Sequence, residues 1–81
     1  MNGTTRVVLY TRAGCHLCED ARALLEWHRR RLHFELAEID VDADPGLRAR
    51  YGLRVPVVAV PGRGELAAPL DPAALRRLLE P

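Results

Sequence analysis

Two cysteines separated by two residues are the part of the sequence best suited to chemistry. Cys15 and Cys18 are the only cysteines among the 81 residues. The apolar run Val7-Val8-Leu9-Tyr10 precedes them and a helical pattern follows, which places Cys15 at the start of a helix. Unpaired backbone N–H groups and the positive end of the helix dipole stabilise an anion there. We therefore expect Cys15 to be a nucleophilic thiolate with a lowered pKa.

Cys18 follows one helical turn later and returns to the same side of the helix. At that spacing it can attack a mixed disulfide formed on Cys15 and release the bound partner. The neighbouring charges act in opposite directions: Arg12 and a protonated His16 favour the thiolate, whereas Glu19 and Asp20 disfavour it. We expect the helix N–H groups to dominate, because they contact the sulfur directly while solvated carboxylates are screened.

The bulk composition sets limits on the kind of protein this is. Residues 1–81 are 48% hydrophobic and 28% charged, with a net charge of +1, and all 12 basic residues are arginine. We expect one monomeric domain, with no nucleic acid and no membrane among its partners. Because the sequence has no apolar stretch of membrane-spanning length and no signal-peptide pattern, we expect a cytoplasmic protein. In that compartment a cysteine pair is catalytic, redox-sensing or metal-binding more often than structural.

The spacing of hydrophobic residues along the sequence predicts the strands and helices that hold the cysteines. Strands are expected at 6–11, 34–41 and 55–60, with a short hairpin partner at 65–67. Helices are expected at 15–31, after Asp44-Pro45 with a stop at Gly52, and after Asp71-Pro72, where each aspartate is the N-cap. In the first helix, Trp27 should be half exposed and His28 should pack at an interface. The order β-α-β-α-β-β-α predicts an α/β protein, with a four-stranded mixed sheet and helices on both faces.

Several segments together resemble the thioredoxin superfamily. They are Cys-His-Leu-Cys at a helix start, the segment Asp-Val-Asp-Ala-Asp-Pro, and Val55-Pro56 before the third strand. The short length is similar to that of glutaredoxins and small glutaredoxin-like proteins. The resemblance implies a thioredoxin-like fold and a thiol–disulfide oxidoreductase in which Cys15 attacks and Cys18 resolves. It also implies that Pro56 is cis beside the disulfide and that the backbone of Val55 contacts the substrate.

Other positions match glutaredoxins only in part. Arg12 occupies the place of their basic residue three before the first cysteine, and His16 lies between the two cysteines. Glutaredoxins usually carry Gly-Gly after the hairpin, where this chain has Ala67-Ala68, although Asp71 could still serve in substrate binding. We therefore expect no bound cofactor and only weak or partial use of glutathione as cosubstrate. The expected partners are a disulfide-containing protein or glutathione, together with a reductase.

Metal binding is the main alternative function. Cys15 and Cys18, with or without His16, could carry copper or take part in iron–sulfur assembly. Small copper chaperones also place Cys-x-x-Cys after their first strand, but they end in a strand, whereas this chain ends in a helical pattern. A non-catalytic scaffold would leave both cysteines idle. We therefore assign no metal-binding residues and favour the redox function.

Overall fold

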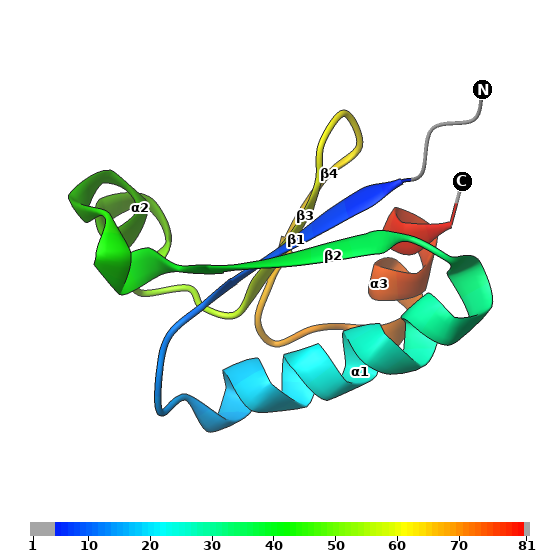
Figure 1. The fold of residues 1–81 in the computed structure, drawn as a ribbon, viewed down its shortest axis with the longest axis horizontal. Helices are drawn as coiled ribbons and strands as arrows, with labels where there is room; N and C mark the ends of the chain where they lie inside the picture. The colour runs from blue at the N-terminus through cyan, green and yellow to red at the C-terminus, as the bar shows by residue number, and fades with distance from the viewer. Residues whose placement is uncertain (1–4, 81) are drawn as a thin grey trace.

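A four-stranded mixed sheet forms the centre of the structure, a computed structural model that describes residues 5–80 (Figure 1). Its strand order is β2-β1-β3-β4, with β1 parallel to β2 and antiparallel to β3, and β4 antiparallel to β3. The predicted α/β architecture is therefore confirmed. The elements are β1 (Arg6–Thr11), α1 (His16–Leu32), β2 (Glu35–Asp40), a short 3-10 helix η1 (Val41–Ala43), α2 (Pro45–Tyr51), β3 (Val57–Val60), β4 (Gly64–Ala67) and α3 (Pro72–Leu79). None of these helices is long and apolar enough to cross a membrane.

The helices cover the two faces of the sheet unequally. Helices α1 and α3 pack on one face, and α2 lies near the opposite end of the sheet from α3 (Figure 1). The larger core lies beneath α1 and α3; its buried members are Val7, Leu9, Ala21, Leu25, Phe34, Val58, Val60, Leu75 and Leu79. A smaller buried cluster joins Tyr51 of α2 to Val41 of η1 and Val57 of β3. Successive residues along β1 or along β3 pack in different clusters, because successive side chains of a strand point to opposite faces of the sheet.

Tyr51 joins α2 to the sheet. Its ring stacks on Tyr10 with centroids 4.2 Å apart, and its hydroxyl donates a 2.7 Å hydrogen bond to Glu65 in β4. Burial, followed by the contact with the Glu65 carboxylate, raises the pKa of Tyr51 to about 12. The phenol therefore remains protonated and keeps donating at physiological pH.

Some predicted boundaries were wrong by one or two residues. Helix α1 begins at His16, with Cys15 as its N-cap. Strand β2 ends at Asp40 because the Asp40 side chain accepts from the Asp42 N–H at 2.9 Å and starts η1. Strand β3 begins at Val57, so Pro56 precedes it.

The ends of α1 and α2 also differ from expectation. His33 ends α1 in the left-handed conformation, with φ of 56°, and its N–H donates to the Arg29 carbonyl. Gly52 does end α2, but with a right-handed φ of −56°, so it is not a left-handed stop. A Cβ at Gly52 would lie 2.5 Å from the Arg48 carbonyl oxygen, so close packing is what favours glycine there.

Trp27 and His28 line a groove of about 530 Å³ between the C-terminal half of α1 and α3. The Arg31 guanidinium lies 3.7 Å from the Trp27 ring centre, and Trp27 is 48% exposed, as predicted. The His28 ring meets the Trp27 ring edge-on at a centroid distance of 5.0 Å. Partial burial, then the charges of Arg31 and Arg76, lower the pKa of His28, while Glu80 opposes them.

The fluorescence of Trp27, the only tryptophan, should report the protonation of His28. We expect a transition with its midpoint below the ordinary His value of 6.5, and we expect it to disappear in His28→Gln. Since the folded pKa is lowered, the stability linked to His28 should be full above about pH 6.5 and should fall as the pH drops through the folded pKa. A midpoint at or above 6.5 in the folded protein would contradict this assignment.

Candidate active site

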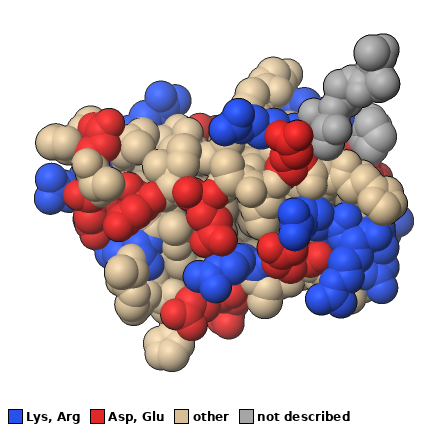
Figure 2. All heavy atoms as spheres, in the orientation of Figure 1, with Lys and Arg blue, Asp and Glu red and all other residues tan. Residues whose placement is uncertain are grey.

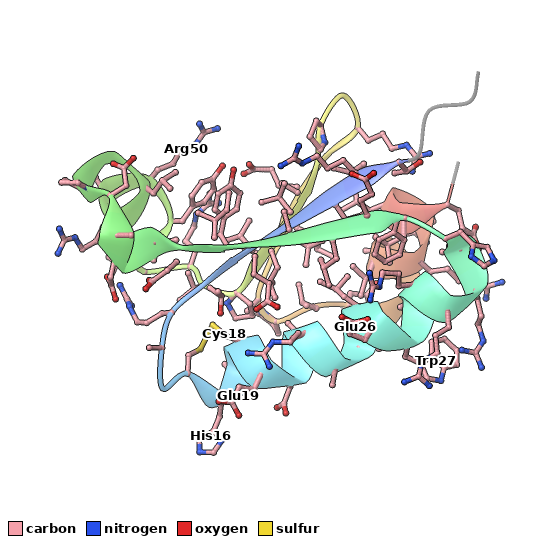
Figure 3. All side chains as sticks on the ribbon, in the orientation of Figure 1. His16, Cys18, Glu19, Glu26, Trp27 and Arg50 are labelled. Atoms are coloured by element: carbon pink, nitrogen blue, oxygen red, sulfur yellow. A yellow bond between two sulfur atoms is a disulfide. The ribbon has the colours of Figure 1, made fainter. Side chains whose placement is uncertain are left out.

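The two cysteines lie where β1 is connected to α1. Gly14 has a positive φ of 71°, which turns the chain immediately before Cys15. Cys15 is extended, with φ of −103° and ψ of 111°, and caps the helix. Cys15 and Cys18 form a disulfide with their Cα atoms 5.2 Å apart, at the first turn of α1 (Figure 3). The connection from strand to helix therefore positions both sulfurs at a helix N-terminus.

The two sulfurs have different surroundings. The Cys18 backbone N–H donates to the Cys15 sulfur, here a neutral disulfide sulfur, at 3.1 Å, and in the reduced protein the same N–H would face a Cys15 thiolate at the helix N-terminus. Cys15 is half-buried, whereas Cys18 is only 1% exposed. Of the two cysteines, Cys15 is therefore the more accessible, and Cys18 lies behind it with its sulfur bonded to that of Cys15.

Arg12 supports the loop in front of the cysteines. Its Nε and Nη2 donate to the Asp42 carboxylate at 2.8 and 3.0 Å, and its Nη1 donates to the Gly52 carbonyl at 2.9 Å. The hydrogen bond from Arg12 lowers the pKa of Asp42 and raises that of Arg12 itself. In this structure the predicted substrate-binding residue thus connects the end of β1 to η1 and to the C-terminus of α2.

Val55 and Pro56 lie next to the end of β1. Tyr10 pairs with Val57, so Pro56 precedes β3 at the point where β1 leads toward Cys15. The Val55–Pro56 peptide bond is cis, and Pro56 is fully buried. The Pro56 carbonyl accepts from the Ala68 N–H at 3.0 Å. Among residues 5–80, neither the N–H nor the carbonyl of Val55 takes part in a backbone hydrogen bond outside the helices and strands.

A small groove of about 220 Å³ passes between α1 and the segment that follows β4. It is lined by Leu17, Asp20, Ala21, Leu24, Pro56, Ala68, Pro69 and Leu70. Neither this groove nor the second cis bond, which joins Ala68 to Pro69, was predicted from the sequence. The sequence feature that pointed to the groove was an apolar residue, Leu17, within the Cys-x-x-Cys segment. In the structure this leucine is 61% exposed.

The remaining predicted site residues are His16 and Asp71. His16 is exposed, and its side chain projects away from Cys18 and from the sheet (Figure 3). Asp71 is the N-cap of α3, where its Oδ2 accepts from the Ala74 N–H at 2.8 Å. Within residues 5–80, no group of three or more His, Cys, Asp or Glu side chains is arranged to hold a metal ion. In this arrangement His16 does not join the two sulfurs as a third metal ligand.

Comparisons with known proteins agree with this geometry. A model of the glutaredoxin-like domain (DUF836) matches residues 6–80. The uncharacterized protein Rv0508 of Mycobacterium tuberculosis is 40% identical over 76 residues, covering 88% of this chain and 78% of its own length. The structure of Ne2328 from Nitrosomonas europaea is 35% identical with a TM-score of 0.80, covering 95% of this chain and 93% of that chain. The structure of XcR50 from X. campestris is 38% identical with a TM-score of 0.76, covering 90% and 93% respectively.

Proposed function

We propose, since the chain belongs to the glutaredoxin-like domain family, that it is a thiol–disulfide oxidoreductase working through Cys15 and Cys18. At the level of the family, the Cys-x-x-Cys pair supports a thioredoxin-like redox role. The observation that carries the finer proposal is the asymmetry of the pair. Cys15 is accessible and receives a backbone N–H at 3.1 Å, whereas Cys18 is buried one turn behind it.

The proposed reaction is two successive thiol–disulfide exchanges. In the first, the Cys15 thiolate attacks one sulfur of the substrate disulfide, the substrate S–S bond breaks, and the second substrate sulfur leaves as a thiolate that takes a proton from water. In the second, the Cys18 thiol loses its proton and its sulfur attacks the Cys15 sulfur. The Cys15–Cys18 disulfide forms and the first substrate sulfur leaves as a thiol. The substrate gains two electrons and two protons, and the protein is oxidised by the same amount.

The backbone next to Pro56 is the proposed substrate contact. A chain laid in extended form beside Val55 could exchange backbone hydrogen bonds with it, as peptides do at exposed strand edges. Arg12 would act as a positioning residue, because its bonds to Asp42 and Gly52 fix the loop that carries Cys15. His16 and Asp71 remain proposed contacts of the bound partner at the rim of the site.

The oxidised pair must be reduced again by a second partner. We propose a cytoplasmic monomer that takes two electrons from a reductase or from glutathione. The absence of Gly-Gly at Ala67-Ala68 argues for weak use of glutathione. A cytoplasmic location would keep the pair cycling, because thiol systems there keep cysteines reduced.

Stoichiometric reduction of insulin tests the proposal. The protein is reduced, freed of reductant and mixed with insulin. After acid quenching, the free thiols of the protein and those of insulin are counted separately. We expect one Cys15–Cys18 disulfide for each insulin disulfide that is opened. Failure to open any insulin disulfide, with the protein folded and fully reduced, would overturn the proposal.

A further inference from the structure

We infer that the groove lined by Leu17, the residue just before Cys18, selects protein substrates that present an apolar side chain with a basic residue near it, and that it disfavours glutathione. The inference rests on the proposed oxidoreductase function and uses the same two exchange steps. It concerns which disulfides are attacked fastest. The groove in question is the one of about 220 Å³ lined by Leu17, Asp20, Pro56 and Pro69, among others.

The size and the lining of the groove favour a single apolar side chain. Sites for whole small molecules usually measure about 300 Å³ or more, so this groove is small for one. All of its lining residues except Asp20 are apolar. Leu17 forms part of its wall and is 61% exposed, so an incoming apolar side chain would remove that leucine from water. A partner chain paired with the Val55 backbone would lie beside Pro56, which belongs to the same groove.

The charges at the groove favour a basic neighbour and disfavour an anion. Within residues 5–80, Asp20 is the one charged residue that lines the groove, and Glu19 precedes it in the first turn of α1. Figure 2 shows acidic side chains over this end of α1, whereas the arginines of its last turn gather at the other end. Arg12 already donates to Asp42 and Gly52. Glutathione carries two carboxylates and one ammonium, so it is a net anion, and among residues 5–80 no residue lining the groove is a cation that could receive a carboxylate.

A matched set of peptides tests the selection. Four peptides contain the same intramolecular disulfide and differ only at two positions that flank it. The first position holds Leu or Ser, and the second holds Arg or Glu. Oxidised glutathione is the fifth substrate, and insulin serves as the general one. The reduced protein is mixed with each in turn, and second-order rate constants are measured by acid quenching and mass spectrometry.

We expect Leu peptides to react at least about tenfold faster than Ser peptides, the usual size of discrimination by an apolar pocket. Arg peptides should react about threefold to tenfold faster than Glu peptides at low ionic strength, and added salt should reduce that ratio. Oxidised glutathione should react at least about tenfold slower than the Leu–Arg peptide.

Variants of the protein assign each preference to its residue. Asp20→Asn should lower the Arg/Glu ratio and leave the Leu/Ser ratio unchanged. Glu26→Gln, which removes an acid farther along α1, should change neither ratio (Figure 3). Leu17→Ser should lower the Leu/Ser ratio, whereas Leu53→Ser, at a leucine that is fully exposed and outside the groove, should not. These ratios are insensitive to a general change in Cys15 reactivity, because such a change affects all peptides alike.

The possible failures are distinguishable. Equal rates for all four peptides within about twofold, or glutathione reacting as fast as the Leu–Arg peptide, would overturn the selection while the oxidoreductase function stands. If the folded, fully reduced protein failed to open any insulin disulfide, the proposed function itself would fail.

Discussion

Replacing Cys18 with serine should trap the protein on its substrate as a stable mixed disulfide. Cys15 can still attack, because its position at the helix N-terminus does not depend on the Cys18 sulfur. The second exchange cannot occur, since serine supplies no thiol to resolve the intermediate. Incubation of reduced Cys18→Ser with insulin should therefore give a covalent adduct, detected by mass spectrometry under non-reducing conditions and released by dithiothreitol.

Cys15→Ser is the matched control for this experiment. Cys18 is only 1% exposed, so its thiol should not reach a partner disulfide, and no adduct should accumulate above the level of the double Ser variant. Catalytic turnover should be lost in both single variants. An adduct on Cys18 in Cys15→Ser that forms as fast as the one on Cys15 would show that the roles of the two cysteines are reversed.

Replacing Leu25 with alanine should destabilise the fold more than any surface change. Leu25 is 0% exposed and belongs to the core between α1, α3 and the sheet. Removing its side-chain volume there should cost about 2–5 kcal/mol of unfolding free energy. A chain of 81 residues is expected to have about 4–12 kcal/mol in total, so the loss is a large fraction of its stability. Urea unfolding of the oxidised protein measures it.

Leu17→Ala in the same helix serves as the comparison. Leu17 is 61% exposed, so its truncation should change the unfolding free energy by no more than about 0.5 kcal/mol. If the two substitutions had similar effects on stability, Leu25 would not lie in the core as described. The pair also separates the two uses of leucine on α1, one for packing and one at the groove.

Signals confined to a few neighbouring residues were sufficient to predict most of the fold. Asp44-Pro45 and Asp71-Pro72 each contain an N-cap and a first-turn proline, and both helices begin there. The spacing of apolar residues predicted the positions of the strands and of α1 to within a few residues. The end of α1 was harder to predict, because His33 adopts a left-handed conformation usually taken by glycine.

The candidate site was predictable only where its residues are neighbours in sequence. Cys15 and Cys18 carry their chemistry in their own spacing. The partners of Arg12 lie 30 and 40 residues away, so the sequence offered no local sign that its guanidinium would contact Asp42 and Gly52. The groove also depends on the association of α1 with Ala68, Pro69 and Leu70 after the chain has folded. Contacts of this kind follow from tertiary packing.

The pH dependence of Cys15 alkylation tests the central claim most directly. In a Cys18→Ser background, the rate of reaction with iodoacetamide follows the thiolate fraction of Cys15 alone. The helix N-terminus and the Cys18 backbone N–H on the sulfur at 3.1 Å, a bond that serine at position 18 retains, predict an apparent pKa well below the ordinary value of about 8.5. An apparent pKa of about 8.5 or higher would contradict the assignment of Cys15 as the activated nucleophile.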